Sequence, residues 1–333
     1  MYILMSIIYW ISLIILLFFI YNYVLEHSTS ANYKVLKNQK YLKFDDSIQI
    51  EQYNYENYNN IESLKRNKIF IHIPYEKNER NWSDFYGRSS NQLNIDLCIL
   101  CIKSVIYHCA HKYDIILYNN YNVGTLLNEP NQEDLCNIKN PSQLSGVDLT
   151  QWENYCKAKI IYKYGGVIMD PYFFFYDCPL DYIMFPNTFH VLHHTNEGLN
   201  VSSKPLIPST NHWLSSPPKN KNMNTYIKYL QHLCIHYYSV DHKHFDKTFE
   251  KLYLLPSYNP KYMGIIDIND KPVESRDLLK KEEIVFDNDA FCLFINIPFF
   301  KKYTQHAYIL KMNESQIKSS NTFLGEFISQ YCS

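Results

Sequence analysis

The sequence has almost no net charge, and its basic residues form no cluster. Over 333 residues, 33 acidic side chains nearly balance 32 basic ones, which leaves a formal charge of -1. Nucleic-acid-binding domains usually carry a basic surface, and no block of Lys and Arg interleaved with aromatic residues is present. The composition therefore argues against a nucleic acid as the partner. The 46 % hydrophobic content is typical of a globular chain and argues against a disordered one.

The cysteines lack the pattern of a zinc site or a disulfide framework. There are nine, an odd number, and they are scattered along the chain. Cys98 and Cys101 form a C-x-x-C pair, but no second such pair and no suitably spaced histidine pair accompanies it. The residues around them are spaced as on a helix, so we expect reduced, buried cysteines.

Charge is also absent from residues 3–25, a run of 23 apolar or uncharged side chains near the start of the sequence. This is about the length that a membrane-spanning helix needs, and aromatic residues lie toward both of its ends, as interfacial anchors do. We expect a single-pass membrane anchor. The alternatives are a buried core helix and a cleaved signal peptide, the latter favoured by the small residues 28–31.

The flanks of this run bear on its orientation. Four lysines follow it between residues 34 and 43 and no basic residue precedes it, which by the positive-inside rule favours a cytosolic domain. Three glycosylation sequons, at Asn81, Asn200 and Asn313, favour the opposite side. Such sequons arise easily in a chain rich in Asn and Ser, so the basic flank counts for more and a cytosolic domain is favoured, with a lumenal one as the alternative.

Three segments follow from the distribution of apolar residues: the anchor at 3–25, a stem at 26–67 whose second half is polar and repetitive, and a folded domain at 68–333. The domain begins with a βαβ pattern. Residues 68–74 predict a buried strand ended by proline, residues 92–110 a helix and residues 113–119 a second strand. A mostly parallel sheet with helices on its faces is the expected architecture.

The most informative stretch is residues 157–181, KAKIIYKYGGVIMDPYFFFYDCPLD. Residues 149–164 predict a helix that ends at Gly165, where glycine takes a positive φ without strain. A short strand follows and ends at Asp170. A carboxylate at the carboxyl end of a parallel strand lies where open α/β sheets bind ligands. The alternative is that Asp170 caps the turn at Pro171.

These features, in this order, resemble the family-32 and capsular-polysaccharide glycosyltransferases over about residues 68–181. The resemblance implies a GT-A fold, a nucleotide-sugar-binding α/β sandwich, and places Asp170 as the first aspartate of the DXD sugar-binding motif after the double glycine Gly165 and Gly166. It implies a UDP- or GDP-sugar donor, Mn²⁺ or Mg²⁺ held by Asp170, and transfer of a hexose with retention to a glycan, protein or lipid acceptor.

The chain departs from the family pattern at three positions. Asn154 and Lys157 stand where the family usually has an aspartate and an arginine, and Tyr172 stands where the second aspartate of the motif belongs. Lys157 keeps a positive charge for a phosphate but lacks the bidentate fork of arginine. One carboxylate suffices for a hydrated metal only if substrate phosphates supply other ligands.

Two later residues are candidates by analogy. His306 is the nearest counterpart of a histidine that often completes the family's metal site, and Trp213 is an aromatic residue of the kind on which sugar rings stack. Asp177 and Asp181 are weaker candidates for the missing carboxylate. The rival hypotheses are a membrane-tethered binding or scaffold protein that kept the fold without turnover and, more distantly, a hydrolase with paired carboxylates.

Overall fold

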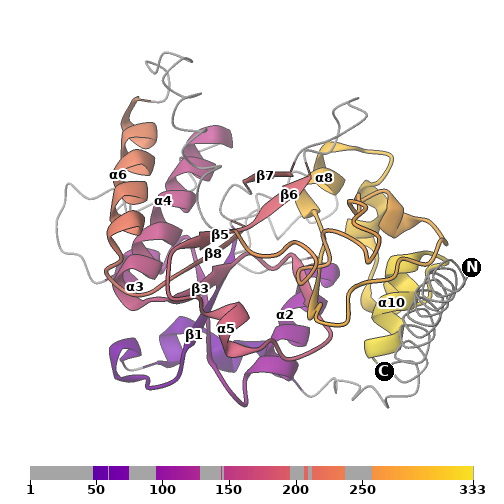
Figure 1. Cartoon of the computed structure of the whole chain (residues 1–333), viewed down its shortest axis with the longest axis horizontal. Helices are drawn as coiled ribbons and strands as arrows, with labels where there is room; N and C mark the ends of the chain where they lie inside the picture. The colour runs from indigo at the N-terminus through magenta and orange to yellow at the C-terminus, as the bar shows by residue number, and fades with distance from the viewer. Residues whose placement is uncertain are drawn as a thin grey trace, which may run out of the picture. The chain divides into compact units, whose positions relative to one another are not determined.

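The structure is a computed structural model of the whole chain (Figure 1). It describes residues 48–58, 60–74, 95–127, 144, 146–195, 206–208, 212–236 and 257–332. The chain divides into two units at residues 43 and 44, and the expected anchor at 3–25 lies outside the described residues. Within the described ranges, no helix combines the length and the apolar character that crossing a bilayer requires.

The centre of the fold is a five-stranded sheet in the order β2-β1-β3-β8-β5. Its strands are β1 (Lys68–Ile73), β2 (Asp114–Asn119), β3 (Gly166–Met169), β5 (His190–Val191) and β8 (Trp213–Ser216). β1 pairs in parallel with both β2 and β3, and β8 pairs antiparallel with both β3 and β5. Because β8 alone runs against the others, the sheet is mostly parallel, as the sequence predicts.

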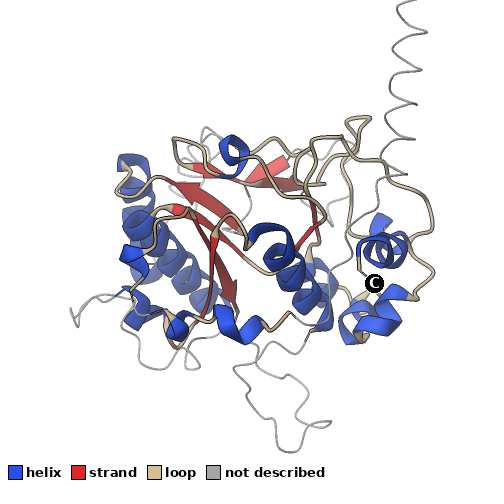
Figure 2. Cartoon of the chain, turned by 90° about the horizontal axis from the view of Figure 1, so that it is seen from below, coloured by secondary structure: helices blue, strands red, loops and turns tan. Residues whose placement is uncertain are grey.

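Helices cover both faces of this sheet (Figure 2). α2 (Asp96–Cys109) connects β1 to β2, and α3 (Val123–Leu127) and α4 (Gly146–Tyr164) connect β2 to β3. α6 (Lys221–His236) follows β8 and packs along α4 (Figure 1). α2 packs instead against β4 (Phe173–Phe175). The predicted βαβ unit and the helix before Gly165 are thus confirmed, with ends that differ by a few residues.

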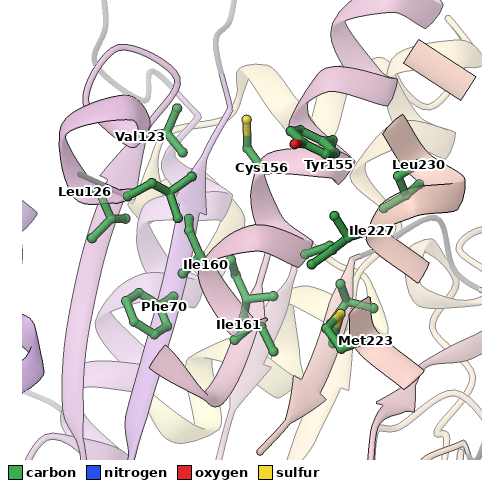
Figure 3. Close-up of a cluster of buried hydrophobic side chains, with 14 of the residues drawn as sticks. Phe70, Val123, Leu126, Tyr155, Cys156, Ile160, Ile161, Met223, Ile227 and Leu230 are labelled. Atoms are coloured by element: carbon green, nitrogen blue, oxygen red, sulfur yellow. The ribbon is translucent and has the colours of Figure 1, made fainter. Parts of the chain in front are cut away.

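One hydrophobic cluster joins α4, α6 and the sheet (Figure 3). Ile160 and Ile161 of α4 are fully buried; Phe70 of β1 lies on one side of them and Met223 and Ile227 of α6 on the other. These apolar positions recur at helical spacing, which is why residues 149–164 fold as a helix against the sheet. The cluster fixes α4, and with it every polar residue that α4 carries.

The second half of the expected stem belongs to the folded unit, which corrects the boundary at residue 67. The segment forms three short 3-10 turns, η1 (Ile50–Tyr53), η2 (Tyr55–Asn57) and η3 (Ile61–Ser63), of which η1 and η2 lie beside β2. Asn54 forms a parallel bridge with Leu117, the Tyr58 hydroxyl donates to the carbonyl of Ile115 at 2.5 Å, and Ile61 is buried. This segment covers the outer edge of the sheet.

Beyond the double glycine, the described chain forms smaller elements. β4 pairs antiparallel with β9 (Cys292–Phe294), and β6 (His193–Thr195) pairs with β7 (Leu206–Pro208). The remaining helices and turns are short: α5 (Asp181–Met184), η6 (Asp277–Leu279), α8 (Ile297–Lys302), η7 (Ala307–Lys311), α9 (Glu314–Lys318) and α10 (Phe323–Tyr331). The described cysteines are free thiols, and Cys98 and Cys101 are buried in α2, as expected.

Candidate functional site

The double glycine places Asp170 at the end of β3. Gly165 has φ +66° and Gly166 has φ +100°. A Cβ on Gly165 would lie 2.5 Å from Cδ of Pro218, and one on Gly166 would lie 2.4 Å from the carbonyl oxygen of Lys68. The sharp turn and the close approach of β3 to β1 therefore require glycine at both positions, and they direct β3 so that Asp170 follows its carboxyl end.

Six polar side chains form a connected group at the carboxyl ends of the adjacent parallel strands β2, β1 and β3. We call them the Asp170 cluster: His72, Asn120, Glu153, Lys157, Asp170 and His212. His72 lies near the end of β1, Asn120 directly after β2 and Asp170 directly after β3. β2 and β3, the next two strands along the chain, pair with β1 on its opposite sides, so the strand order changes direction at β1. Open α/β sheets bind ligands at the carboxyl ends of the strands at such a point.

Asp170 is at the centre of this cluster. Lys157 donates from Nζ to Oδ1 of Asp170 at 2.6 Å, and Nδ1 of His72 lies 3.3 Å from the same oxygen. The other oxygen, Oδ2, is 2.7 Å from Nδ1 of His212. Since an ionised carboxylate only accepts, His212 is the donor in this bond. The Asp170 carboxylate is thus contacted by one side chain from β1, one from α4 and one from the residue that precedes β8.

Charge and burial act against each other on Asp170. Burial on its own raises the pKa of the carboxyl, but the charge of Lys157, the hydrogen bond from His212 and the contact with His72 outweigh it. The pKa of Asp170 consequently lies well below its ordinary value, and the carboxylate is ionised at neutral pH. The arrangement is a buried ion pair with two additional imidazole contacts.

Asn120 and Glu153 extend the cluster on the far side of His72. Nδ2 of Asn120 donates to Oε1 of Glu153 at 2.6 Å, which turns the amide oxygen toward Nε2 of His72, 2.5 Å away. Nε2 of His72 is therefore the donor in that contact. The ring of His72 also packs at 5.2 Å from the ring of Tyr118. The chain of hydrogen bonds fixes the orientation of the imidazole next to Asp170.

The residues predicted from the sequence divide into two groups. Lys157 and Asp170 meet, and Asn154 is buried on α4 one helical turn before Lys157. Tyr172 is also buried, with its ring 5.2 Å from that of His212. The backbone amide of Tyr172 donates to the carbonyl of Asp170, so Asp170 begins a turn, but its side chain is used in the cluster and not as a cap of that turn.

The other predicted residues lie elsewhere. Trp213 is fully buried among Phe173, Phe175 and Tyr258, so it presents no face on which a sugar ring can stack, which corrects that expectation. His306 stacks on Phe299 and bonds to Gln305.

The candidates for a second carboxylate have local partners instead. Asp177 accepts from the backbone of Cys178, and Asp181 accepts from Tyr113 and pairs with Lys112. In the described part of the chain, three or more His, Cys, Asp or Glu side chains do not gather into a metal site. The position of the second motif aspartate is thus not taken over by either residue.

The sequence held a partial signal for the missed members of the cluster. His72 interrupts an otherwise apolar strand, and Asn120 follows the last residue of the next one, so both were recognisable as polar groups at strand ends. His212 was not recognisable, because its contact with Asp170 depends on β8 pairing with β3 across 42 residues.

No family model matches the sequence, and no curated protein matches it significantly. The interpretation of the site therefore depends on the chain's own residues and geometry.

Proposed function

We propose that this protein is a membrane-anchored glycosyltransferase of GT-A type, which moves a hexose from a UDP- or GDP-sugar to a glycan, protein or lipid acceptor with retention of configuration. The observation that carries the proposal is the Asp170 cluster, in which side chains from separate elements converge at the carboxyl ends of parallel strands directly after a double glycine. The anchor is proposed from the uncharged run at residues 3–25.

The chemistry of transfer gives the cluster a role. A nucleoside diphosphate gains negative charge as its bond to the sugar breaks, and hydrogen-bond donors and cations held in place beforehand stabilise that charge. His212 is the polar group placed to contact that charge, and Lys157 holds the Asp170 carboxylate to which His212 is bonded. The side chain of His212 is 13 % exposed, against 5 % or less for Lys157 and Asp170, so we assign the contact with the donor to His212 first.

A donor screen tests this proposal. A ligand at a hundred times its dissociation constant stabilises the folded state by about 2.7 kcal/mol, which in a domain of this size raises Tm by several degrees. We expect a UDP- or GDP-sugar to produce such a shift with the full chain. His212→Gln should reduce the shift, whereas the matched control His306→Gln should retain it. The absence of a shift with every donor would contradict the proposal.

A second candidate, a binding or scaffold protein without turnover, is favoured by one observation. Tyr172 occupies the position of the second motif aspartate, and its side chain is buried against His212. A protein of this kind would bind a donor and release no nucleoside diphosphate. Binding and turnover must therefore be measured separately.

A further inference from the structure

Both oxygens of the Asp170 carboxylate already have partners from the protein. Oδ1 receives Nζ of Lys157 at 2.6 Å, and Oδ2 receives Nδ1 of His212 at 2.7 Å. The side chains of Lys157 and Asp170 are 4 % and 5 % exposed. Oδ1 has a second contact, Nδ1 of His72 at 3.3 Å, so a divalent cation would reach Asp170 only through the remaining lone pair of Oδ2, at a buried position next to the Lys157 ammonium.

The one further carboxylate of the Asp170 cluster, Glu153, is bonded to Asn120 and reaches Asp170 only through Asn120 and His72. Mn²⁺ and Mg²⁺ prefer oxygen ligands, and a site made by a protein normally brings more than one carboxylate oxygen to the ion. Here the next candidate position holds Tyr172, which is buried, and Asp177 and Asp181 have partners of their own. The residues present therefore do not fit the metal that the sequence resemblance implies.

We infer that Asp170 is the internal counter-ion of Lys157 and not a ligand of Mn²⁺ or Mg²⁺. This inference concerns the protein alone. The expectation about the ligand, that a nucleotide binds here without a divalent cation, rests on the proposed function.

The charges of the cluster support this assignment. An ammonium group at 2.6 Å neutralises Asp170 and repels a second cation at the same carboxylate. Two imidazoles contact Asp170, that of His72 on β1 and that of His212 before β8, and Asn120 and Glu153 join the cluster through His72. Of these Glu153 alone is acidic, and it is bonded to Asn120 and not to Lys157.

The test is a titration of the full chain with Mn²⁺ alone, followed by electron paramagnetic resonance of the free ion. We expect wild type and Lys157→Met/Asp170→Asn to give the same titration curve. This double variant removes both charges while keeping side chains of similar size, so it avoids a buried unpaired charge. One equivalent of Mn²⁺ bound by wild type and lost in the double variant would overturn the inference.

A second measurement isolates Lys157. In Lys157→Met the carboxylate loses its cation, and we expect at least a tenfold gain in Mn²⁺ affinity over wild type if that variant folds. Unchanged affinity in a folded Lys157→Met protein would mean that the lysine does not keep the metal away.

Nucleotide binding separates failure of this inference from failure of the proposed function. We expect UDP or GDP to raise Tm equally in EDTA and in Mn²⁺. A shift that requires Mn²⁺ and is lost in the double variant would overturn the inference while supporting the proposed function. The absence of any shift would contradict the proposed function, and the titration with Mn²⁺ alone would still decide the role of Asp170.

Discussion

Asp170 and Lys157 are each almost fully buried, so each charge depends on the other. Breaking a buried pair by removing one partner typically costs about 3–5 kcal/mol, whereas replacing both partners with neutral residues of similar size costs far less. A variant that lacks Asp170 alone is therefore not a clean probe of binding, because it leaves the Lys157 ammonium buried without its counter-ion.

We predict that Lys157→Met lowers the free energy of unfolding by about 3–5 kcal/mol. Lys157→Met/Asp170→Asn should lose clearly less than the sum of the two single changes. Urea denaturation of the four proteins gives the coupling energy directly. Additive losses would mean that the two side chains do not interact in the folded protein.

The ionisation of Asp170 predicts how stability depends on pH. Its pKa in the folded state is lowered relative to the unfolded chain, so the folded state favours the ionised form. The contribution is therefore complete at neutral pH and is lost as the pH falls below the ordinary carboxyl value of about 4. We expect wild type to lose more stability than Lys157→Met/Asp170→Asn between pH 6 and 3, which denaturation curves at each pH would show. Parallel losses would contradict a lowered pKa.

Residue-scale prediction from the sequence was accurate where the cause is local. The positive φ of Gly165 follows from its place after a helix, and the position of Asp170 follows from the strand before it. The partners of Asp170 come from positions 13, 42 and 98 residues away. Such contacts depend on strand order, which periodicity does not reveal.

At the scale of elements, the turn between α4 and β3 is the most constrained connection. Both of its glycines have positive φ. A Cβ on Gly165 would meet Pro218, and a Cβ on Gly166 would meet the backbone carbonyl of Lys68 in β1. The carbonyl of Lys68 cannot move away without disturbing the pairing of β1 with β2 and β3. Any residue other than glycine at position 165 or 166 would therefore clash with its neighbours and strain the backbone.

We predict that Gly165→Ala and Gly166→Ala each lower the free energy of unfolding by more than about 1 kcal/mol. Gly166→Ala should have the larger effect, since the obstructing atom is backbone. Gly124→Ala is the matched control: Gly124 lies in α3 without a positive φ, so alanine there should be neutral or slightly stabilising. Thermal or urea unfolding measures all three, and equal effects at all three sites would contradict the account.

Elements were predicted well where apolar residues are periodic and poorly where they are sparse. β1, α2, β2 and α4 each have a buried face that the sequence marks. The turns before β1 have no such periodic apolar face. They consist mostly of polar residues, and they are held by single contacts such as the Tyr58 hydroxyl on Ile115.

At the scale of the whole molecule, the segment before β1, residues 48–67, covers the outer edge of the sheet. β2 is an outer strand of the order β2-β1-β3-β8-β5, and Asn54 and Tyr58 use backbone groups that an uncovered edge would present to another chain. A chain starting at Phe44 keeps this cover, and one starting at Lys68 loses it.

We predict that the chain starting at Lys68 unfolds at a lower temperature than the chain starting at Phe44 and aggregates more readily. Differential scanning fluorimetry and size-exclusion chromatography compare the two. Equal stability and equal solubility would mean that residues 48–67 are a linker after all.

The sequence indicated a mostly parallel α/β sheet because βαβ spacing is a local property of the chain. The antiparallel placement of β8, which brings His212 to Asp170, followed from no pattern in the sequence. The sequence shows that Lys157 and Tyr172 depart from the family pattern. Only the three-dimensional contacts show that Lys157 pairs with Asp170 and that Tyr172 packs against His212.

The most direct test of the central claim is turnover. Phosphorus NMR of UDP- and GDP-sugars incubated in EDTA with the full chain and candidate glycan, protein or lipid acceptors follows the release of nucleoside diphosphate over time. We predict release by the wild-type protein without added metal and none by Lys157→Met/Asp170→Asn. A donor that binds to the wild-type protein but is never cleaved, with or without Mn²⁺ and candidate acceptors, would contradict the enzymatic account and leave a binding protein.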